Sequence, residues 1–196
     1  MEKPDIKSLS LEQLKAAVTG MGHPPFRARQ IADWLNKGVR DFSQMTNLPQ
    51  PLREQLQQAF RIAGVSIRKK LMSAIDGTVK YLFELEDGET IESVLMRYRY
   101  GWSQCLSTQV GCRMGCAFCA TGLGGMVRNL TAAEMLSQIE AAQQDMGIRV
   151  SSVVLMGMGE PLDNYQQVLA FIRKLAEPGG VHIGLRHITL STCGLV

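Results

Sequence analysis

Three cysteines stand close together in the stretch STQVGCRMGCAFCATGLGG, residues 107–125. Cys112, Cys116 and Cys119 form a C-x3-C-x2-C array, which lets three thiolates converge on one side of a metal centre. An iron–sulfur cube held by only three cysteines leaves one iron without a protein ligand, so that iron can bind a substrate or cofactor. Flanking glycines such as Gly115 and Gly122 let the backbone wrap closely around such a group.

A structural zinc site is the alternative interpretation of these cysteines. Such sites take four ligands, often as two C-x2-C pairs. The chain has no second pair, Cys105 and Cys193 are isolated, and neither His182 nor His187 lies at zinc-finger spacing from a cysteine pair. A zinc ion would need a distant fourth ligand, and a non-catalytic zinc and RNA-binding protein is the competing functional class.

The segments around the loop alternate between strand and helix patterns. Strands are predicted over residues 103–111, 150–160 and 186–192. Helices are predicted over 131–144, with a capping box from Thr131 to Glu134, and over 163–177, with Asp163 as N-cap. This βαβαβ order predicts right-handed crossovers and an α/β sheet or barrel with parallel strands.

Two smaller parts precede this pattern. Residues 1–62 read as a compact helical domain with three helices, the first capped by Ser10 and Gln13 and the second carrying Pro25 in its first turn. Residues 63–100 read as an antiparallel β-meander linker, with Asp76-Gly77 as a hairpin signal. Residues 101–196 then form the third domain.

Composition indicates an ordinary globular chain. Of 196 residues, 45% are hydrophobic and 20% charged, and no apolar run is long enough to span a membrane. The N-terminus lacks the apolar segment of a secretory signal, so we expect a cytoplasmic protein with reduced thiols and no membrane partner. Five cysteines are an odd number, which argues against a purely structural disulfide framework.

The basic excess lies in the first half of the chain. Residues 1–104 hold 15 Lys and Arg against 12 Asp and Glu, whereas residues 105–196 hold six of each. A polyanionic partner such as RNA fits this distribution, and so does an ordinary solvated face. The candidate phosphate contacts are Arg27, Arg29, Arg97 and Arg99.

Four stretches together resemble one known family: QCLSTQVGCRMGCAFCATG, VVLMGMGEPLDNY, RHITLSTCGLV and FRARQIADWL. The cysteine array after a first barrel strand resembles the radical S-adenosylmethionine (SAM) enzymes, and the whole set is similar to the RlmN family of RNA adenine-C2 methyltransferases. The resemblance implies a partial radical SAM (βα) barrel preceded by a helical RNA-binding domain and a β-meander. It also implies methylation of carbon 2 of adenosine in 23S rRNA and tRNA.

The resemblance assigns cofactors to particular residues. Cys112, Cys116 and Cys119 would hold a 4Fe-4S cluster whose open iron binds S-adenosylmethionine. Gly159 and Glu160 of GMGEP, together with Ser191, match positions that contact S-adenosylmethionine. Taken alone, the GMGEP glycines are also compatible with a plain strand-to-helix turn.

Two residues match catalytic positions of the family. Cys105 matches a cysteine that takes the C2 proton as a thiolate and forms a transient disulfide with a methyl-carrying cysteine. Without the resemblance it would read as a buried thiol on a strand. Glu92 matches a carboxylate that accepts a proton, and a structural salt bridge is its alternative role.

The family's methyl-carrying cysteine would lie beyond residue 196, so we expect the chain to be the front of a longer protein and inactive by itself. For the full-length protein the resemblance implies 23S rRNA and tRNA as partners, an external flavodoxin-like electron donor and a monomer. A Cfr-like enzyme that methylates carbon 8 of adenosine is the alternative within the class.

Overall fold

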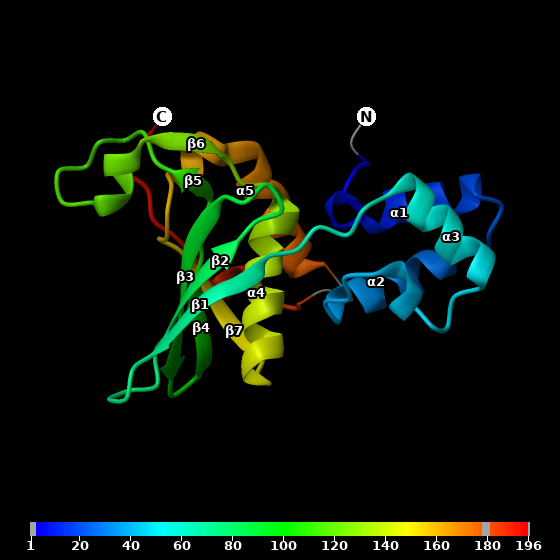
Figure 1. The fold of residues 1–196 in the computed structure, drawn as a ribbon, viewed down its shortest axis with the longest axis horizontal. Coiled ribbons are helices and arrows are strands. Elements are labelled where there is room, and N and C mark those ends of the chain that lie inside the picture. The colour runs from blue at the N-terminus through cyan, green and yellow to red at the C-terminus, as the bar shows by residue number, and fades with distance from the viewer. Residues whose placement is uncertain (1–2, 178–180, 196) are drawn as a thin grey trace.

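The computed structural model describes residues 3–177 and 181–195. A helical part formed by residues near the N-terminus lies beside a larger part built on a β-sheet (Figure 1). The helical part consists of η1 Ile6–Ser8, α1 Leu11–Gly20, α2 Arg27–Asn36, η2 Phe42–Gln44 and α3 Gln50–Ala59. Its own core is made of buried aliphatic side chains from these elements, among them Leu14, Val18, Ile31, Leu52 and Leu56.

The ends of these helices follow local rules. The predicted capping box of Ser10 and Gln13 is confirmed, because both reciprocal hydrogen bonds are present. The predicted place of Pro25 in the first turn of α2 is wrong. Pro25 belongs to a preceding turn, in which the N–H groups of Arg27 and Ala28 bond to carbonyls three residues back, and α2 begins only at Arg27.

A six-stranded sheet forms the larger part, in the order β1-β2-β3-β4-β7-β8. Its strands are β1 Ser66–Met72, β2 Val79–Glu84, β3 Thr90–Tyr98, β4 Gly101–Cys105, β7 Val150–Leu155 and β8 Ile188–Leu190. The first four pair antiparallel, whereas β4–β7 and β7–β8 are parallel. The meander and the half-barrel are therefore one continuous sheet.

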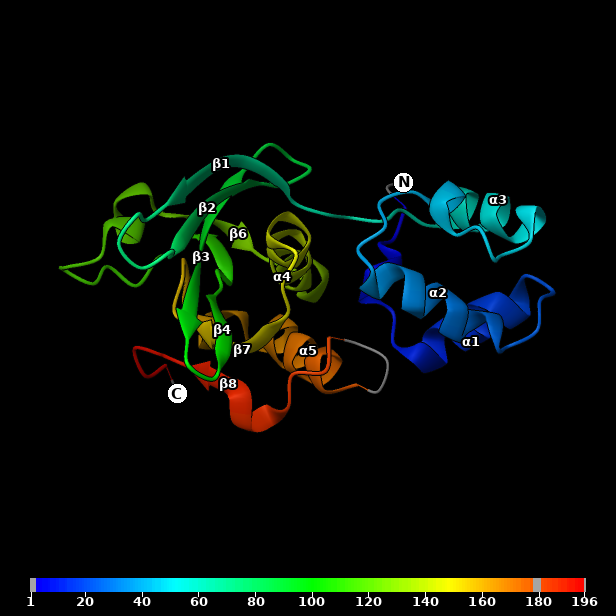
Figure 2. The same ribbon diagram turned by 90° about the horizontal axis from the view of Figure 1, so that it is seen from below.

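Two helices cover one face of this sheet (Figure 2). They are α4 Ala132–Met146 and α5 Tyr165–Ala176. Tyr81 and Phe83 of β2 are fully buried in one core with Ile139 of α4 and Phe171 of α5. The strand and helix alternation confirms the predicted α/β class with a partial barrel.

The capping box at Thr131 and Glu134 is confirmed at the start of α4. The predicted N-cap role of Asp163 is wrong, because residues Pro161–Asn164 form the short helix η4 and α5 begins at Tyr165. Asn164 takes the cap position without a capping bond from its side chain.

The predicted single strand over residues 103–111 is broken. After Cys105, the N–H of Leu106 bonds to the carbonyl of Val154, and the N–H of Thr108 bonds to that of Met158. This bends the chain out of the sheet into β5 Gln109–Gly111, which pairs with β6 Met126–Asn129. Cys112, Cys116, Cys119 and the short helix η3 Ala120–Gly124 lie in the excursion between β5 and β6, which projects from the sheet (Figure 1).

The Asp76-Gly77 signal marks a turn between β1 and β2, as predicted. It is a longer connection than a two-residue hairpin, closed by the N–H of Ser73 on the carbonyl of Thr78. Near the C-terminus, η5 Leu185–His187 leads into β8. Among the described residues, no helix is both long and apolar enough to cross a membrane.

Candidate functional site

The cysteine loop faces the carboxyl ends of the parallel strands across an open hollow of about 280 Å3. Cys112, Cys116 and Cys119 line one side of it. The end of β7 and the segments that follow β7 and β8 form the other side, namely Leu155, Met156, Gly157, Gly159, Glu160 and residues 191–193. The carboxyl ends of parallel strands are where α/β folds bind ligands, so the topology brings the three thiols to the expected edge.

Two glycines allow the segment after β7 to lie against the segment after β4. A Cβ on Gly157 would come within 2.6 Å of the carbonyl oxygen of Leu106. Gly159 has φ +100°, and its Cβ would lie 2.6 Å from the Cβ of Gln109. The glycines of GMGEP are therefore required by close backbone approach, which goes beyond an ordinary turn.

Glu160 joins the two strand ends that form the far wall. Its carboxylate accepts hydrogen bonds from Thr192 Oγ1 at 2.6 Å, from the N–H of Cys193 at 2.8 Å and from the N–H of Leu162 at 3.0 Å. Burial works to raise the pKa of this carboxyl, but the hydrogen bonds outweigh it and lower the pKa below its ordinary value. Glu160 is therefore held ionised with part of its hydrogen-bonding capacity already used within the chain.

A second carboxylate fixes the cysteine loop itself, and sequence reasoning missed this role. Asp163 accepts hydrogen bonds from Arg113 Nε and from Gln109 Nε2, each at 2.9 Å, and Arg113 Nη2 completes a bidentate ion pair. The bonds from Arg113, and then from Gln109, hold the pKa of Asp163 below its ordinary value. No local pattern predicts this contact, because its partners lie about 50 residues away along the chain.

The thiols differ in their electrostatic surroundings. Hydrogen bonds from Thr121 lower the pKa of Cys119, which favours the thiolate that metal ligation requires. Cys193 lines the same hollow, but its hydrogen bond to Glu160 raises its pKa. Cys105, Cys112, Cys116, Cys119 and Cys193 are all free, and the predicted transient disulfide of Cys105 stays a prediction.

Three cysteine thiols line one side of the hollow, which is the donor set of an iron–sulfur cube with one open iron. Among the described residues, no group of three or more His, Cys, Asp or Glu side chains is arranged to hold a single metal ion. A cube presents its irons at separate corners, so it takes three spaced thiols lining a hollow. Glycine backbone, Ser191 and Glu160 on the facing wall suit a small polar cofactor beside it.

Cys105 lies beyond this lining, at the end of β4, where it pairs with Val94 of β3 and Val154 of β7. Burial raises the pKa of its thiol, with a smaller opposing effect from the backbone of Met156. The environment therefore favours the neutral thiol, contrary to the expectation of a thiolate. The residue remains a predicted catalytic group.

Glu92 lies on the same sheet face as Cys105, the face away from α4 and α5. It is two residues from Val94, the partner of Cys105, and strand side chains alternate between faces. Its carboxylate forms an ion pair with Lys80 at 2.7 Å and both side chains are about half exposed. The salt-bridge alternative is therefore realised in the structure, and the proton-acceptor role remains a prediction.

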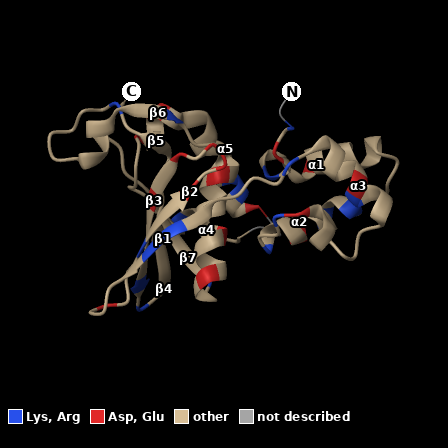
Figure 3. Cartoon of the chain, in the orientation of Figure 1, with Lys and Arg blue, Asp and Glu red and all other residues tan. Residues whose placement is uncertain are grey.

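The arginines predicted to meet RNA have different surroundings. Arg27 bonds to Gln30 and to the carbonyl of Asn47, and Arg29 lines a hollow between the helical part and helices α4 and α5. Arg97 lies over the ring of Trp102, 5.9 Å from its centroid, and Arg99 is exposed. Figure 3 shows further basic residues on β1. RNA contact by these residues stays a prediction.

Known proteins resemble the chain over its whole length. The sequence profile described as the ribosomal RNA large subunit methyltransferase N-terminal domain matches residues 5–62, and that of the radical SAM superfamily matches residues 106–196. A relative from Alkaliphilus oremlandii (strain OhILAs), "Probable dual-specificity RNA methyltransferase RlmN", is 53% identical over 100% of this chain and 57% of its own length. One of the same name from Geobacillus kaustophilus (strain HTA426) is 51% identical over 98% and 54%.

A solved structure has the same fold as this chain. The crystal structure of a radical SAM methyltransferase from Sphaerobacter thermophilus superposes with a TM-score of 0.89 and 40% sequence identity, covering 98% of this chain and 57% of the other. The chain thus spans a little over half the length of the relatives it matches. The two family profiles match segments in both halves of the chain, the cysteine loop carries the C-x3-C-x2-C array, and the fold is that of a solved radical SAM methyltransferase. The chain belongs to the RlmN family of the radical SAM superfamily.

Proposed function

We propose that this chain is part of a radical SAM enzyme that methylates carbon 2 of adenosine in 23S rRNA and tRNA. The observation that carries the proposal is the single hollow lined by Cys112, Cys116 and Cys119 on one side and by the GMGEP segment on the other. The relatives' name, dual-specificity RNA methyltransferase, supports RNA as the substrate class.

The three loop cysteines would hold a 4Fe-4S cluster, and Gly159, Glu160 and Ser191 would contact S-adenosylmethionine. When bound, these groups supply a carbon-centred radical by reductive cleavage of the sulfonium. The chain's own residues prepare the site: Gly157 and Gly159 admit the close backbone approach, and Glu160 holds the ends of β7 and β8 together.

The chemistry of the target explains the need for a radical. Carbon 2 of adenine lies between two ring nitrogens and is electron-poor, so it does not attack an electrophilic methyl sulfonium. In the proposed reaction Cys105 removes the C2 proton. A thiol must lose its own proton before its sulfur can accept another, and burial raises the pKa of Cys105, which opposes this loss. Glu92 on the same face is the proposed acceptor.

We further propose that the full-length enzyme works as a monomer in the cytoplasm with a flavodoxin-like electron donor. A Cfr-like enzyme acting on carbon 8 would share the cysteine loop. Mass spectrometry of nucleosides from RNA treated with the full-length protein separates the two, since C2-methyladenosine supports the proposal and C8-methyladenosine contradicts it.

The cluster can be tested on the chain itself. Anaerobic reconstitution with iron and sulfide is expected to give a brown protein with absorbance at about 400 nm and about four irons. Cys116→Ala should lose this absorbance, whereas Cys193→Ala, whose side chain lines the same hollow, should keep it. A colourless protein that retains one zinc after the same treatment would overturn the cluster assignment.

A further inference from the structure

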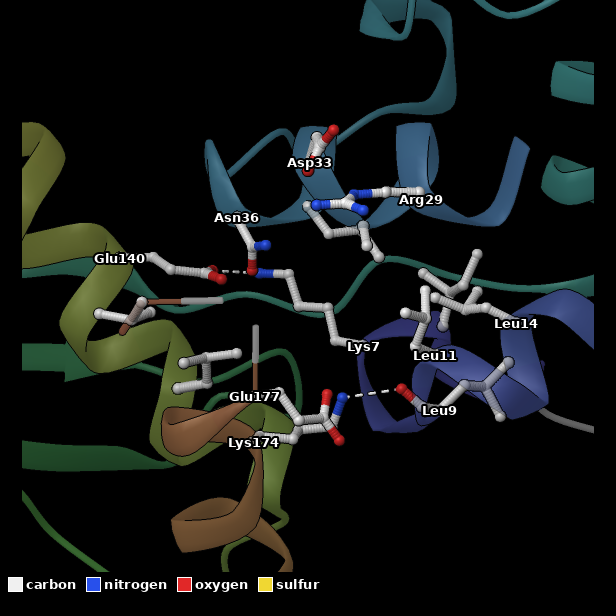
Figure 4. A pocket seen from close by; sticks show the side chains of 15 residues that line it. Lys7, Leu9, Leu11, Leu14, Arg29, Asp33, Asn36, Glu140, Lys174 and Glu177 are labelled. Carbon is white, nitrogen blue, oxygen red and sulfur yellow. Dashed lines mark hydrogen bonds and ion pairs between the residues drawn. The ribbon is translucent and has the colours of Figure 1, made fainter. Parts of the chain in front are cut away.

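A buried ion pair joins the helical part to the sheet part. Lys7 of η1 places its Nζ 2.5 Å from Glu140 Oε2 of α4 and 3.3 Å from Ser137 Oγ. The side chains are only 3% and 5% exposed. Figure 4 shows the Lys7 side chain extending from the helical part to meet Glu140 on α4.

This ion pair is expected to add little to the stability of the fold. Glu140 Oε1 is buried and has no hydrogen-bond partner, so half of the carboxylate is desolvated without compensation. A buried ion pair can often be replaced by apolar side chains of similar volume without loss of stability. Such a pair fixes the relative orientation of the two parts, because Lys7 meets its charge partner in only one placement of them.

The other contacts of this interface restrict the relative orientation of the two parts less strongly. The two parts have separate hydrophobic cores. A hollow of about 60 Å3 lies between them, lined partly by Leu9, Leu11 and Leu14. Lys174 Nζ donates to the carbonyl of Leu9 and Gln144 Nε2 to that of Lys37, both at 2.8 Å. These two bonds are exposed or only partly buried, so breaking them costs less than separating the buried opposite charges of Lys7 and Glu140.

The same helix is also tied to the candidate site. Gln138 of α4 accepts from the N–H of Ser107 at 3.1 Å and donates to its carbonyl at 2.9 Å. Ser107 Oγ in turn donates to the carbonyl of Glu92 at 2.6 Å and accepts from the N–H of Met158 at 2.9 Å. One turn of α4 therefore contacts both Lys7 and the backbone beside the cysteine hollow.

We propose that Lys7 and Glu140 are positioning residues: their ion pair holds the helical part in one orientation on α4, so that RNA held by the helical part is presented to the cysteine-loop edge of the sheet. The orientation is a property of the chain itself. The consequence for RNA rests on the proposed function.

The first experiment needs no RNA. Donor and acceptor dyes are attached through azido amino acids at Gln58 of α3 and Gln166 of α5, both exposed, and single-molecule energy transfer is recorded. The wild-type chain should give one narrow distribution. The double variant Lys7→Met with Glu140→Leu should stay folded by circular dichroism and give a broadened or shifted one.

The matched control is Lys15→Met with Glu12→Leu, an exposed ion pair within α1. It should keep the wild-type distribution. An unchanged narrow distribution in the Lys7 and Glu140 double variant, or a broad one in the wild type, would overturn the proposal.

A second experiment tests whether this orientation presents bound RNA to the cysteine-loop edge. A tRNA transcript carrying a photoreactive adenosine analogue is bound to each chain, and crosslinked peptides are mapped. The double variant should bind RNA as tightly as the wild type but lose most of its crosslinks to residues 112–125 and 156–160, because a helical part without a fixed orientation no longer holds the RNA at that edge. Equal crosslinking would overturn presentation of RNA. Failure of every chain to bind RNA would contradict the proposed function, and the dye distances would still decide the orientation.

Discussion

At the scale of single residues, the candidate site depends on side chains that hold loops as much as on those that would hold a cofactor. Asp163 connects the segment after β7 to Gln109 and to Arg113 inside the cysteine loop. Glu160 does the same between the ends of β7 and β8. The hollow thus keeps its shape through polar contacts between segments that are distant in sequence.

Asp163→Asn should lower stability at neutral pH by about 1 kcal/mol, because a charge-assisted pair with a mostly exposed Arg113 is lost. The pKa of Asp163 is lowered in the folded chain, so its contribution is present above the unfolded value of about 3.9 and disappears as pH falls through the folded value. Urea unfolding from pH 7 down to pH 3 should show the two chains converging in acid. A constant difference throughout would contradict this assignment.

Gly157→Ala should destabilise the chain by about 1–3 kcal/mol, the usual cost of overpacking. Its new Cβ would meet the Leu106 carbonyl at 2.6 Å, and that backbone is held by a hydrogen bond from the N–H of Gly157 itself. Gly124→Ala is the control, since its Cβ would meet nothing within 4 Å. Chemical denaturation should separate the two variants, and equal stability would argue against the close approach.

At the scale of elements, α4 is the helix that connects the parts of the molecule. Its start was predictable, because the capping box of Thr131 and Glu134 is a local signal. Its contacts were not, since Glu140 meets Lys7 across 133 positions and Gln138 meets Ser107 across 31. Similarly, the pattern of residues 103–111 indicated a strand but not its break after Cys105, which depends on bonds to Val154 and Met158.

Lys7→Met alone should destabilise the chain by about 3–5 kcal/mol, because Glu140 is left buried without its charge partner. Adding Glu140→Leu should recover most of that loss. Urea denaturation of the single and double variants provides the measurement, and coupling between the two sites is the expected result. Additive losses would mean that the two side chains do not act as a pair.

At the scale of the whole molecule, the chain contains the cysteine loop and the first three parallel strands of the barrel. The matched relatives are nearly twice as long. In the proposed roles Cys105 removes a proton and Cys112, Cys116 and Cys119 hold the cluster, so we expect none of these four to carry a methyl group.

The 196-residue chain with a reconstituted cluster, reductant and S-adenosylmethionine should not methylate a protein-free RNA substrate. The RNA would be digested to nucleosides and analysed by mass spectrometry, with a full-length relative as the positive control. Methylated adenosine formed by the 196-residue chain would show that one of its own cysteines carries the methyl group.

Local patterns were sufficient for the cysteine loop, the two capping boxes and the alternation of strands and helices, because each depends on residues within a few positions of one another. The tertiary structure alone decided that Asp163 holds Arg113 and not a helix end, that Glu92 pairs with Lys80, and that burial raises the pKa of the Cys105 thiol. Pairing and desolvation are set by neighbours in space. The folded sheet brings those neighbours together from distant parts of the chain.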